Sequence, residues 1–436
     1  MKQSGYILLI SLIAACGGLL FGFDTAVISG VLPFLQDHFN LDEWLSGWVV
    51  SILTVGCIFG VLVAGAIADK FGRKKVLFAG SLLFLLSAIG TALANNIVIF
   101  QIIRLSGGIA VGMVSVTSPM YIAEVSPPDK RGRMVAINQL TIVIGILVAF
   151  FSNYFLSSIG NDNWRYMLGV MSIPAMLFFI LLFTVPESPR WLVRQGDKKT
   201  SLSILKKINN EQDASTILKE IENSLLQKRE KKKVSFRKPK AAIALMTGIF
   251  LAIFQQITGI NTIMYYAPTI FKSMGAGMDS ALLQTVLIGS INLIFTVVSL
   301  FFIDTKGRKP LLLFGSFLMT IALGVLSFGV YAGVSQYLIL TSILVYIAAF
   351  AVSLGTVTWV LIAELFPNAS REMGMSISTM FLWIAAFGVT FLFPVLLKKC
   401  GVSLTFFIFM LICLAAFFFY LFAIKETKDI KLEDIE

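Results

Sequence analysis

Twelve apolar runs, each long enough to cross a lipid bilayer, constrain this chain more than any other feature of its sequence. They fall near residues 6–34, 46–68, 76–94, 97–122, 134–158, 165–185, 241–271, 282–303, 310–331, 336–363, 374–397 and 402–424. A helix needs about 20 apolar residues to cross the hydrocarbon core, and backbone groups in lipid must be satisfied within a helix or a closed barrel. Charged residues make up only 14% of the chain, against about 25% in soluble domains. The sequence therefore predicts an all-α membrane protein and excludes a soluble enzyme, a disordered chain and a disulfide-rich secreted module.

Basic residues gather on one side of these runs. With the N-terminus in the cytosol, 30 of the 35 Lys and Arg residues fall on the cytosolic side and four on the other. The positive-inside rule then predicts a multi-pass protein of the plasma or bacterial inner membrane with both termini in the cytosol. The net charge of +11 is explained by attraction to the anionic cytosolic leaflet, so no nucleic-acid partner is expected.

Three polar motifs recur along the chain at nearly constant separation. An Asp-x-x-Gly-Arg-Lys turn, a Glu seven residues before an Arg, and a Glu at the end of a six-span block repeat at offsets of 235, 240 and 239 residues. Two homologous halves that both begin in the cytosol explain these offsets and make the repeat a parallel one. The predicted domains are a six-helix bundle at 1–185, a cytosolic linker with amphipathic helices at 186–240, a second six-helix bundle at 241–424 and a cytosolic tail at 425–436.

The charges in these motifs have two interpretations. They are topology markers, or they form a cytosolic charge network that holds the halves together when that side is closed. Recurrence in both halves favours the network. Its predicted members are Asp69, Arg73, Glu124, Arg131, Glu187, Arg190, Asp304, Arg308, Glu364, Arg371 and Glu426.

Asp24 and Arg104 are the only charged residues placed well inside predicted spans. A charge there costs about 2.5–3.5 kcal/mol on insertion scales. At about 1.5 Å per residue the two lie roughly 16 and 12 Å from the outer ends of their helices, so they can pair. One interpretation is a static ion pair that fixes helix packing. The other is proton coupling, because changing the contact with an Arg changes the proton affinity of an Asp.

Amide side chains occur in spans of both halves. Each amide both donates and accepts hydrogen bonds, which suits a ligand with many hydroxyls. A single amide is explained equally well by an interhelical hydrogen bond, but five of them favour a shared polar cavity. The candidates are Gln139, Gln255, Gln256, Asn261 and Asn292.

Several motifs together resemble the sugar porter family of the major facilitator superfamily, over nearly the whole chain. They are Asp69…Gly72-Arg73-Lys74, Arg104 with Gly107-Gly108, Pro119-Met-Tyr121-Ile-Ala-Glu124, Pro186-Glu-Ser-Pro189-Arg-Trp-Leu192, Gln255-Gln256-Ile-Thr-Gly259-Ile-Asn261, Tyr265-Tyr266-Ala-Pro268 and Asp304…Gly307-Arg308. Within the family the chain looks most like the bacterial D-xylose and hexose:proton symporters.

The resemblance implies a major facilitator fold of 12 transmembrane helices in two parallel six-helix halves, and monosaccharide uptake with a proton by alternating access. It implies proton coupling at Asp24 and Arg104, and gating at Tyr265, Tyr266 and Gly355. The sugar contacts that it implies are Phe21, Gln139, Gln255, Gln256, Asn261, Asn292, Trp359 and Trp383.

Departures from the family pattern weaken any transfer of xylose specificity. Thr356 stands where a Pro often follows Gly355, so a hinge in that span would rest on Gly355 alone. Leu382, Ala386 and Ile146 replace amides of the xylose-type pattern. A sugar uniporter, a cyclic-polyol (inositol-type) symporter and a non-transporting sugar sensor remain alternatives.

The expected partners are a monosaccharide, a proton and the lipid bilayer, and the protein is expected to work as a monomer. No cofactor, metal site or enzyme activity is expected. The four cysteines lack C-x-x-C spacing, and neither a buried His cluster nor an activated nucleophile is visible.

Overall fold

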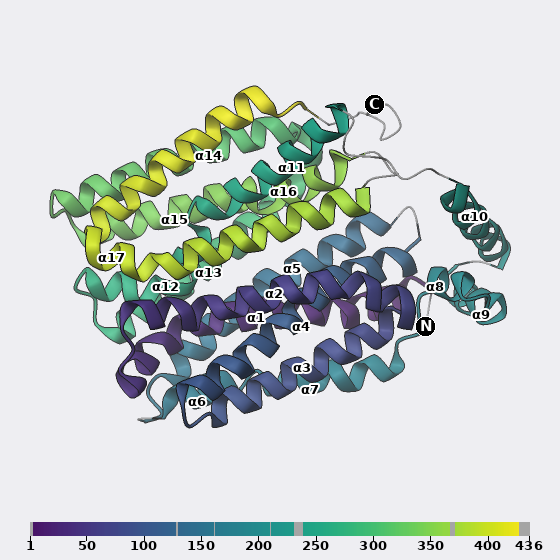
Figure 1. Ribbon diagram of the computed structural model, residues 1–436, viewed down its shortest axis with the longest axis horizontal. Coiled ribbons are helices and arrows are strands. Elements are labelled where there is room, and N and C mark those ends of the chain that lie inside the picture. The colour runs from purple at the N-terminus through teal and green to yellow at the C-terminus, as the bar shows by residue number, and fades with distance from the viewer. Residues whose placement is uncertain are drawn as a thin grey trace. The chain divides into compact units, whose positions relative to one another are not determined.

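The computed structural model describes residues 3–127, 130–160, 162–209, 211–230, 239–366 and 371–426. Every regular element within these ranges is a helix (Figure 1). The expected all-α class is therefore confirmed, and its physical reason is that a helix satisfies its own backbone groups in lipid.

The N-terminal half contains six apolar helical segments. They are α1 (Gln3–Phe39), α2 (Glu43–Phe71), α3 (Arg73–Leu93), α4 (Ile97–Val125), α5 (Arg131–Leu156) and the interrupted pair α6 (Asn163–Gly169) and α7 (Ser172–Leu181), followed by the short η1 (Leu182–Thr184). A capping side chain and a glycine turn determine where some of these helices begin and end. The Asn96 side chain accepts a hydrogen bond from the Ile99 N–H at 2.8 Å and caps α4. Gly72, with φ of +100°, permits the tight reversal between α2 and α3.

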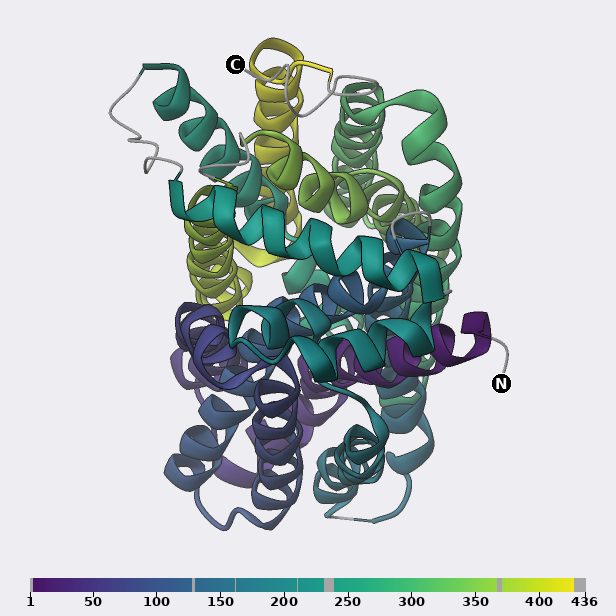
Figure 2. The same ribbon diagram turned by 90° about the vertical axis from the view of Figure 1, so that its right-hand side faces the viewer.

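Three short helices occupy the predicted linker: α8 (Pro189–Arg194), α9 (Lys198–Ile208) and α10 (Glu211–Glu230). Asp197 caps α9 by accepting from the Thr200 N–H at 3.0 Å. Hydrogen bonding from the Thr200 side chain, and from this N–H, holds the pKa of Asp197 below its usual value. Ile204, Leu205 and Ile208 bury the apolar face of α9. The three helices pack against one another, and α9 and α10 lie side by side (Figure 2).

The C-terminal half contains α11 (Pro239–Ile257), α12 (Ile260–Ser273), α13 (Met278–Lys306), α14 (Arg308–Tyr331), α15 (Gln336–Val352), α16 (Leu354–Glu364) and α17 (Arg371–Ala423). Within the described residues, 11 helical stretches are long and apolar enough to cross a membrane, and the last covers 51 residues. Gly401, with φ of +72°, interrupts α17. Because one span needs only about 20 residues, α17 provides two, and the twelve predicted runs are all accommodated.

By packing, the chain divides into two compact units. The first contains Met1–Asp24, Gly56–Ile146 and Leu168–Lys232, and the second contains Thr25–Val55, Leu147–Met167 and Lys233–Glu436. The boundary passes through the interiors of α1, α2, α5 and α6. Packing in this conformation therefore follows a different division from the sequence repeat, and the domain boundaries inferred from the repeat stay a prediction.

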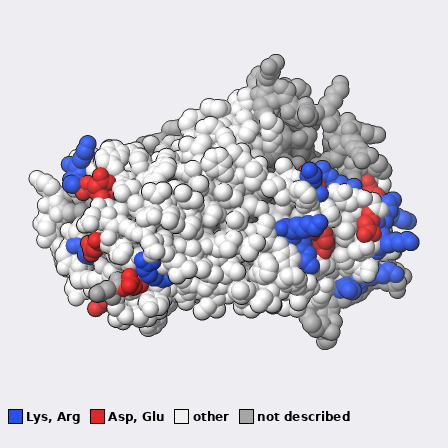
Figure 3. Space-filling model, turned by 60° about the horizontal axis from the view of Figure 1, so that its bottom comes forward, with Lys and Arg blue, Asp and Glu red and all other residues white. Residues whose placement is uncertain are grey.

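The surface has the character expected of a membrane protein. On the face in Figure 3, charged side chains gather at the two ends, and a broad band between them carries none. Large apolar side chains such as Phe155, Phe301 and Phe422 are 66%, 73% and 81% exposed. Water would penalise such exposure, whereas lipid does not.

Candidate functional site

The structure brings the two intramembrane charges together. Asp24 of α1 and Arg104 of α4 are each 1% exposed. Arg104 Nη1 forms an ion pair with Asp24 Oδ1, and Nη2 donates to the backbone carbonyl of Asp24. The second carboxylate oxygen of Asp24, Oδ2, has no hydrogen-bond partner among the described residues. One oxygen is thus committed to the guanidinium, and the other remains able to take a proton.

Close helix packing holds this pair in place. A Cβ added at Gly56 or at Gly60 of α2 would stand 2.8 Å from the Cα of Gly108 or Gly112 of α4. The backbones of α2 and α4 are therefore in direct contact beside Arg104. This is the close approach that small residues at four-residue spacing permit in membranes.

Three amides of the second unit form a hydrogen-bonded chain. Gln255 Nε2 donates to the Leu354 carbonyl at 3.0 Å, Gln256 Nε2 donates to Gln255 Oε1 at 3.2 Å, and Asn261 Nδ2 donates to Gln256 Oε1 at 2.7 Å. Residues five apart on a regular helix point about 140° away from each other. Gly259, with φ of +96°, breaks the span between α11 and α12, and this break allows Gln256 and Asn261 to meet.

The other predicted sugar contacts are divided between the two units. Phe21 and Gln139 are half-buried in the first unit. In the second unit, Asn292 and Trp383 are buried and Trp359 is half-buried.

Three of the departures from the family pattern are apolar side chains that are buried or half-buried. Leu382 and Ala386 of α17 are each 1% exposed, and Ile146 of α5 is half-buried. Leu382 and Ala386 are therefore part of the interior rather than of the lipid-facing surface.

The predicted gating residues have distinct surroundings. Tyr265 and Tyr266 are buried in α12, and the Tyr266 hydroxyl donates to the Thr390 carbonyl at 2.9 Å. The tenth span is interrupted at Ser353, whose φ and ψ are −119° and −96°, two residues before Gly355. Gly315 of α14 makes room for this break, because a Cβ there would collide with the Ser353 side chain. The break in this span therefore depends on Ser353 and Gly315 and not on Gly355 alone. No pattern in the sequence indicated that the helix would be interrupted at Ser353.

An unpredicted group of aromatic residues, here called the aromatic clamp, joins α2 to α17 within the second unit. It consists of Trp44, Trp48, Phe387 and Phe391, with ring centroids 5.6–6.2 Å apart. Glu43 beside it forms an ion pair with Lys398. The available sequence signal is the four-residue spacing within each aromatic pair, which places both members on one helix face.

The charge cluster of the first unit is centred on Arg73. Its Nε lies 2.9 Å from Glu124 Oε2, and its Nη2 donates to Glu124 Oε1 at 3.0 Å. Glu187 Oε1 accepts from the backbone N–H groups of Arg73, Lys74 and Ser188 at 3.0, 3.2 and 2.8 Å. Burial raises the pKa of Glu187, and these three N–H groups oppose that rise.

The second unit repeats these contacts. Arg308 Nη2 donates to Glu364 Oε1 at 2.9 Å, and Nη1 donates to the Ile303 carbonyl at 3.1 Å. Glu426 accepts from the backbone N–H groups of Arg308 and Lys309, each at 3.0 Å. The repeated motifs therefore make the same contacts in both places.

The other predicted members of the charge network make different contacts or are exposed. Asp69 pairs with Arg73 at 3.4 Å and with Arg194 at 2.7 Å. Arg131 Nε donates to the Ala123 carbonyl at 3.0 Å, and Arg190 is exposed. The side chains of Asp304 and Arg371 lie outside the described part of the structure. Each cluster lies within one unit, so the role predicted for the network in joining the halves stays a prediction.

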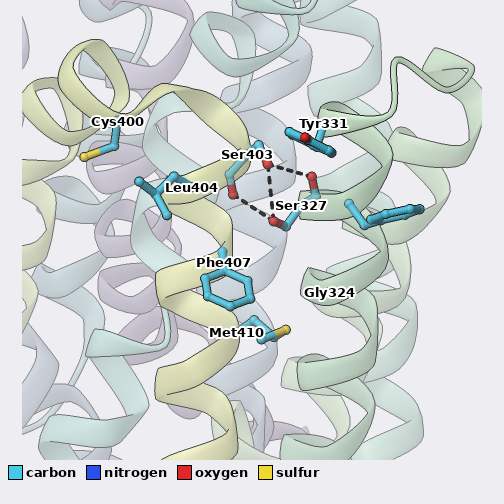
Figure 4. Close-up of a pocket in the computed structure, with 9 residues that line it drawn as sticks. Gly324, Ser327, Tyr331, Cys400, Ser403, Leu404, Phe407 and Met410 are labelled. Carbon is cyan, nitrogen blue, oxygen red and sulfur yellow. Dashed lines mark hydrogen bonds between the residues drawn. The ribbon is translucent and has the colours of Figure 1, made fainter.

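A groove of about 540 Å³ lies between α14 and α17 (Figure 4). It is lined by Gly324, Ser327, Phe328, Tyr331, Cys400, Ser403, Leu404, Phe407 and Met410. Ser327 and Ser403 each donate to the other's carbonyl, at 2.9 and 2.8 Å. Phe328 and Tyr331 are 69% and 81% exposed. The groove thus opens on the lipid-facing surface and contains none of the predicted sugar contacts.

Known proteins are similar to this chain in sequence and in fold. The family model described as sugar (and other) transporter matches residues 10–436. The chain is 40% identical to the arabinose-proton symporter of Bacillus subtilis, covering 99% of this chain and 95% of that protein. It is 39% identical to the D-xylose-proton symporter of Escherichia coli, covering 100% and 96%. The inward-open structure of the xylose transporter XylE from E. coli matches with a TM-score of 0.88 at 37% identity, covering 99% of both chains. The fold is that of the major facilitator superfamily, and the chain belongs to the sugar (and other) transporter family.

Proposed function

We propose that this protein is a proton-coupled symporter that takes up a monosaccharide by alternating access, with both termini in the cytosol. The observation that carries the proposal is the fully buried ion pair of Asp24 and Arg104. The names of the similar proteins, which are arabinose-proton and D-xylose-proton symporters, support the same function.

The buried pair supplies a physical means of coupling. The Arg104 guanidinium stabilises the Asp24 carboxylate while the two are in contact. If a conformational change separates them, desolvation favours the protonated acid. Uptake and release of a proton then follow the change in contact. A uniporter or a non-transporting sensor has no need of an ionisable group at this depth, where a charge is costly.

The amide chain and the aromatic residues suit a sugar. Gln255, Gln256 and Asn261 offer donors and acceptors to hydroxyl groups, and Trp359 and Trp383 have flat faces that fit the C–H surfaces of a sugar ring. A cyclic polyol carries the same groups, so this chemistry supports both substrate classes. The buried apolar side chains of Leu382 and Ala386 leave less polar surface for substrate recognition than the xylose-type pattern would.

Uptake by proteoliposomes tests the proposal. Labelled arabinose, xylose, glucose and myo-inositol are supplied with and without an inward proton gradient. Wild-type protein is expected to concentrate at least one of them only with the gradient. Asp24→Asn is expected to exchange that substrate without concentrating it. Asp37→Asn, an exposed position on the same helix, serves as the matched control and should behave as wild type.

Each alternative gives a different result. Equilibration of a sugar that the proton gradient does not change would indicate uniport. Substrate binding without transport would indicate a sensor, and preference for myo-inositol would indicate a polyol symporter. Concentration of substrate by Asp24→Asn would refute coupling through Asp24.

A further inference from the structure

We propose that the coupled proton binds to Oδ2 of Asp24, in a notch above Gly107, where the Ser87 hydroxyl accepts its hydrogen bond. This inference rests on the proposed function of Asp24 and adds which oxygen is protonated and which residue holds the proton. Ser87 is a positioning residue, because it acts through the carboxyl group of Asp24.

The absence of a side chain at Gly107 creates the notch. A Cβ added there would stand 2.9 Å from Asp24 Oδ2 and 2.5 Å from Ser87 Oγ. Ser87, on α3, is 1% exposed. The two oxygens thus face the same small space beside Gly107. Asp24 Oδ1 faces Arg104, whereas Oδ2 faces the notch, so Oδ2 is the oxygen beside Ser87 that takes the proton when the contact with Arg104 is lost.

The hydrogen bond that Ser87 already donates makes its hydroxyl an acceptor toward Asp24. Its hydroxyl donates to the Ile103 carbonyl at 3.3 Å. A hydroxyl has one hydrogen and two lone pairs, so with its hydrogen engaged Ser87 offers only lone pairs to the notch. Those lone pairs stabilise a protonated carboxyl, which donates, and not a carboxylate, which only accepts.

The other groups around Asp24 leave Oδ2 as the titrating atom. Arg104 of α4 and the buried thiol of Cys57 of α2 are the titratable or charged groups that interact with it among the described residues. From α5, the backbone carbonyl of Ile142 faces α1 at Gly22. In the proton transfer, hydronium and the Asp24 carboxylate give water and the carboxylic acid, and release reverses the step.

Removing the hydroxyl tests the inference directly. Ser87→Ala should move the midpoint of the pH dependence of uptake to more acidic pH by about half to one unit, the effect of one hydrogen bond on a protonation equilibrium. Sugar exchange at equal pH on both sides should stay within about twofold of wild type. Ser87→Thr should restore the midpoint. Ser81→Ala is the matched control, because Ser81 is buried on the same helix and donates to the Phe78 carbonyl at 2.8 Å.

Filling the notch is the second test. Gly107→Ala should reduce proton-driven accumulation about tenfold or more while sugar exchange continues. Gly65→Ala, where an added Cβ meets nothing within 4 Å, is the control and should have no effect.

The outcomes separate this inference from the proposed function. If Asp24→Asn is uncoupled but Ser87→Ala keeps the wild-type midpoint or Gly107→Ala keeps the wild-type accumulation, the inference is overturned and the function of Asp24 stands. A midpoint that moves to more alkaline pH in Ser87→Ala also overturns it, since Ser87 would then donate to the carboxylate. If Asp24→Asn still concentrates sugar, both proposals fail.

Discussion

Arg73 and Arg308 make the same contact with a Glu in settings of different burial, so the effects of removing each can be compared. The side chains of Arg73 and Glu124 are 8% and 11% exposed, whereas those of Arg308 and Glu364 are 14% and 21% exposed. The two contacts of Arg73 measure 2.9 and 3.0 Å, and those of Arg308 measure 2.9 and 3.3 Å. The first pair is therefore the more enclosed of the two.

The expected loss of unfolding free energy follows from this difference in burial. Removing one partner of a buried ion pair costs about 3–5 kcal/mol, because the other charge is left uncompensated, while exposed pairs contribute about 0–1 kcal/mol. We expect Arg73→Ala to lower the free energy of unfolding by about 3 kcal/mol. Arg308→Ala should lower it by about 1–2 kcal/mol, since water reaches Glu364 more easily.

Unfolding in detergent micelles, followed by tryptophan fluorescence, measures these changes. Adding Glu124→Ala to Arg73→Ala should cost less than the sum of the two single changes, by about 2 kcal/mol, because both variants remove the same pair. Arg190→Ala, at an exposed position, should stay within about 0.5 kcal/mol of wild type. A loss for Arg73→Ala no larger than that for Arg308→Ala would refute the argument from burial.

Three further predictions concern other parts of the molecule. Burial raises the folded-state pKa of Glu187 above its usual value near 4.5, so its contribution to stability is present below that value and is lost as pH rises through the raised pKa. Thermal unfolding over a pH series should therefore show wild type losing stability relative to Glu187→Gln as pH rises. Trp48→Ala should cost about 2 kcal/mol in the detergent unfolding assay through lost aromatic packing, whereas Lys398→Gln should have little effect, since its ion pair with Glu43 is exposed. Asn261→Ala should weaken sugar binding about tenfold, measured by equilibrium binding, if Asn261 is a sugar contact, and unchanged affinity would argue against that role.

The sequence predicted those features that lipid or the repeat determines. Apolar runs identify helices because an unsatisfied backbone is not tolerated in a membrane, and every regular element among the described residues is a helix. The repeated motifs indicated equivalent positions for Arg73 and Arg308, and the structure gives them the same contacts. Asp24 and Arg104 were recognisable because charge at that depth is unusual.

Features that depend on contacts between distant segments were not predictable in the same way. The break at Ser353 needs the space left by Gly315 of another helix, so a pattern within one span does not reveal it. The aromatic clamp joins Trp48 to Phe391 across more than 300 residues of sequence. Ser87 carries no signal in an apolar helix until Asp24 is placed beside the same glycine.

The amide chain adds a constraint on recognition that residue types alone do not reveal. A main-chain carbonyl only accepts, so Gln255 must present its Nε2 to Leu354, and its Oε1 then accepts from Gln256. By the same reasoning Gln256 presents its own Oε1 to Asn261. Each amide is thereby held in one orientation, and Asn261 at the end of the chain offers a fixed acceptor, Oδ1, together with one remaining N–H. A substrate hydroxyl at this end therefore meets an amide whose polarity is set by the backbone of α16, about 100 residues away in sequence.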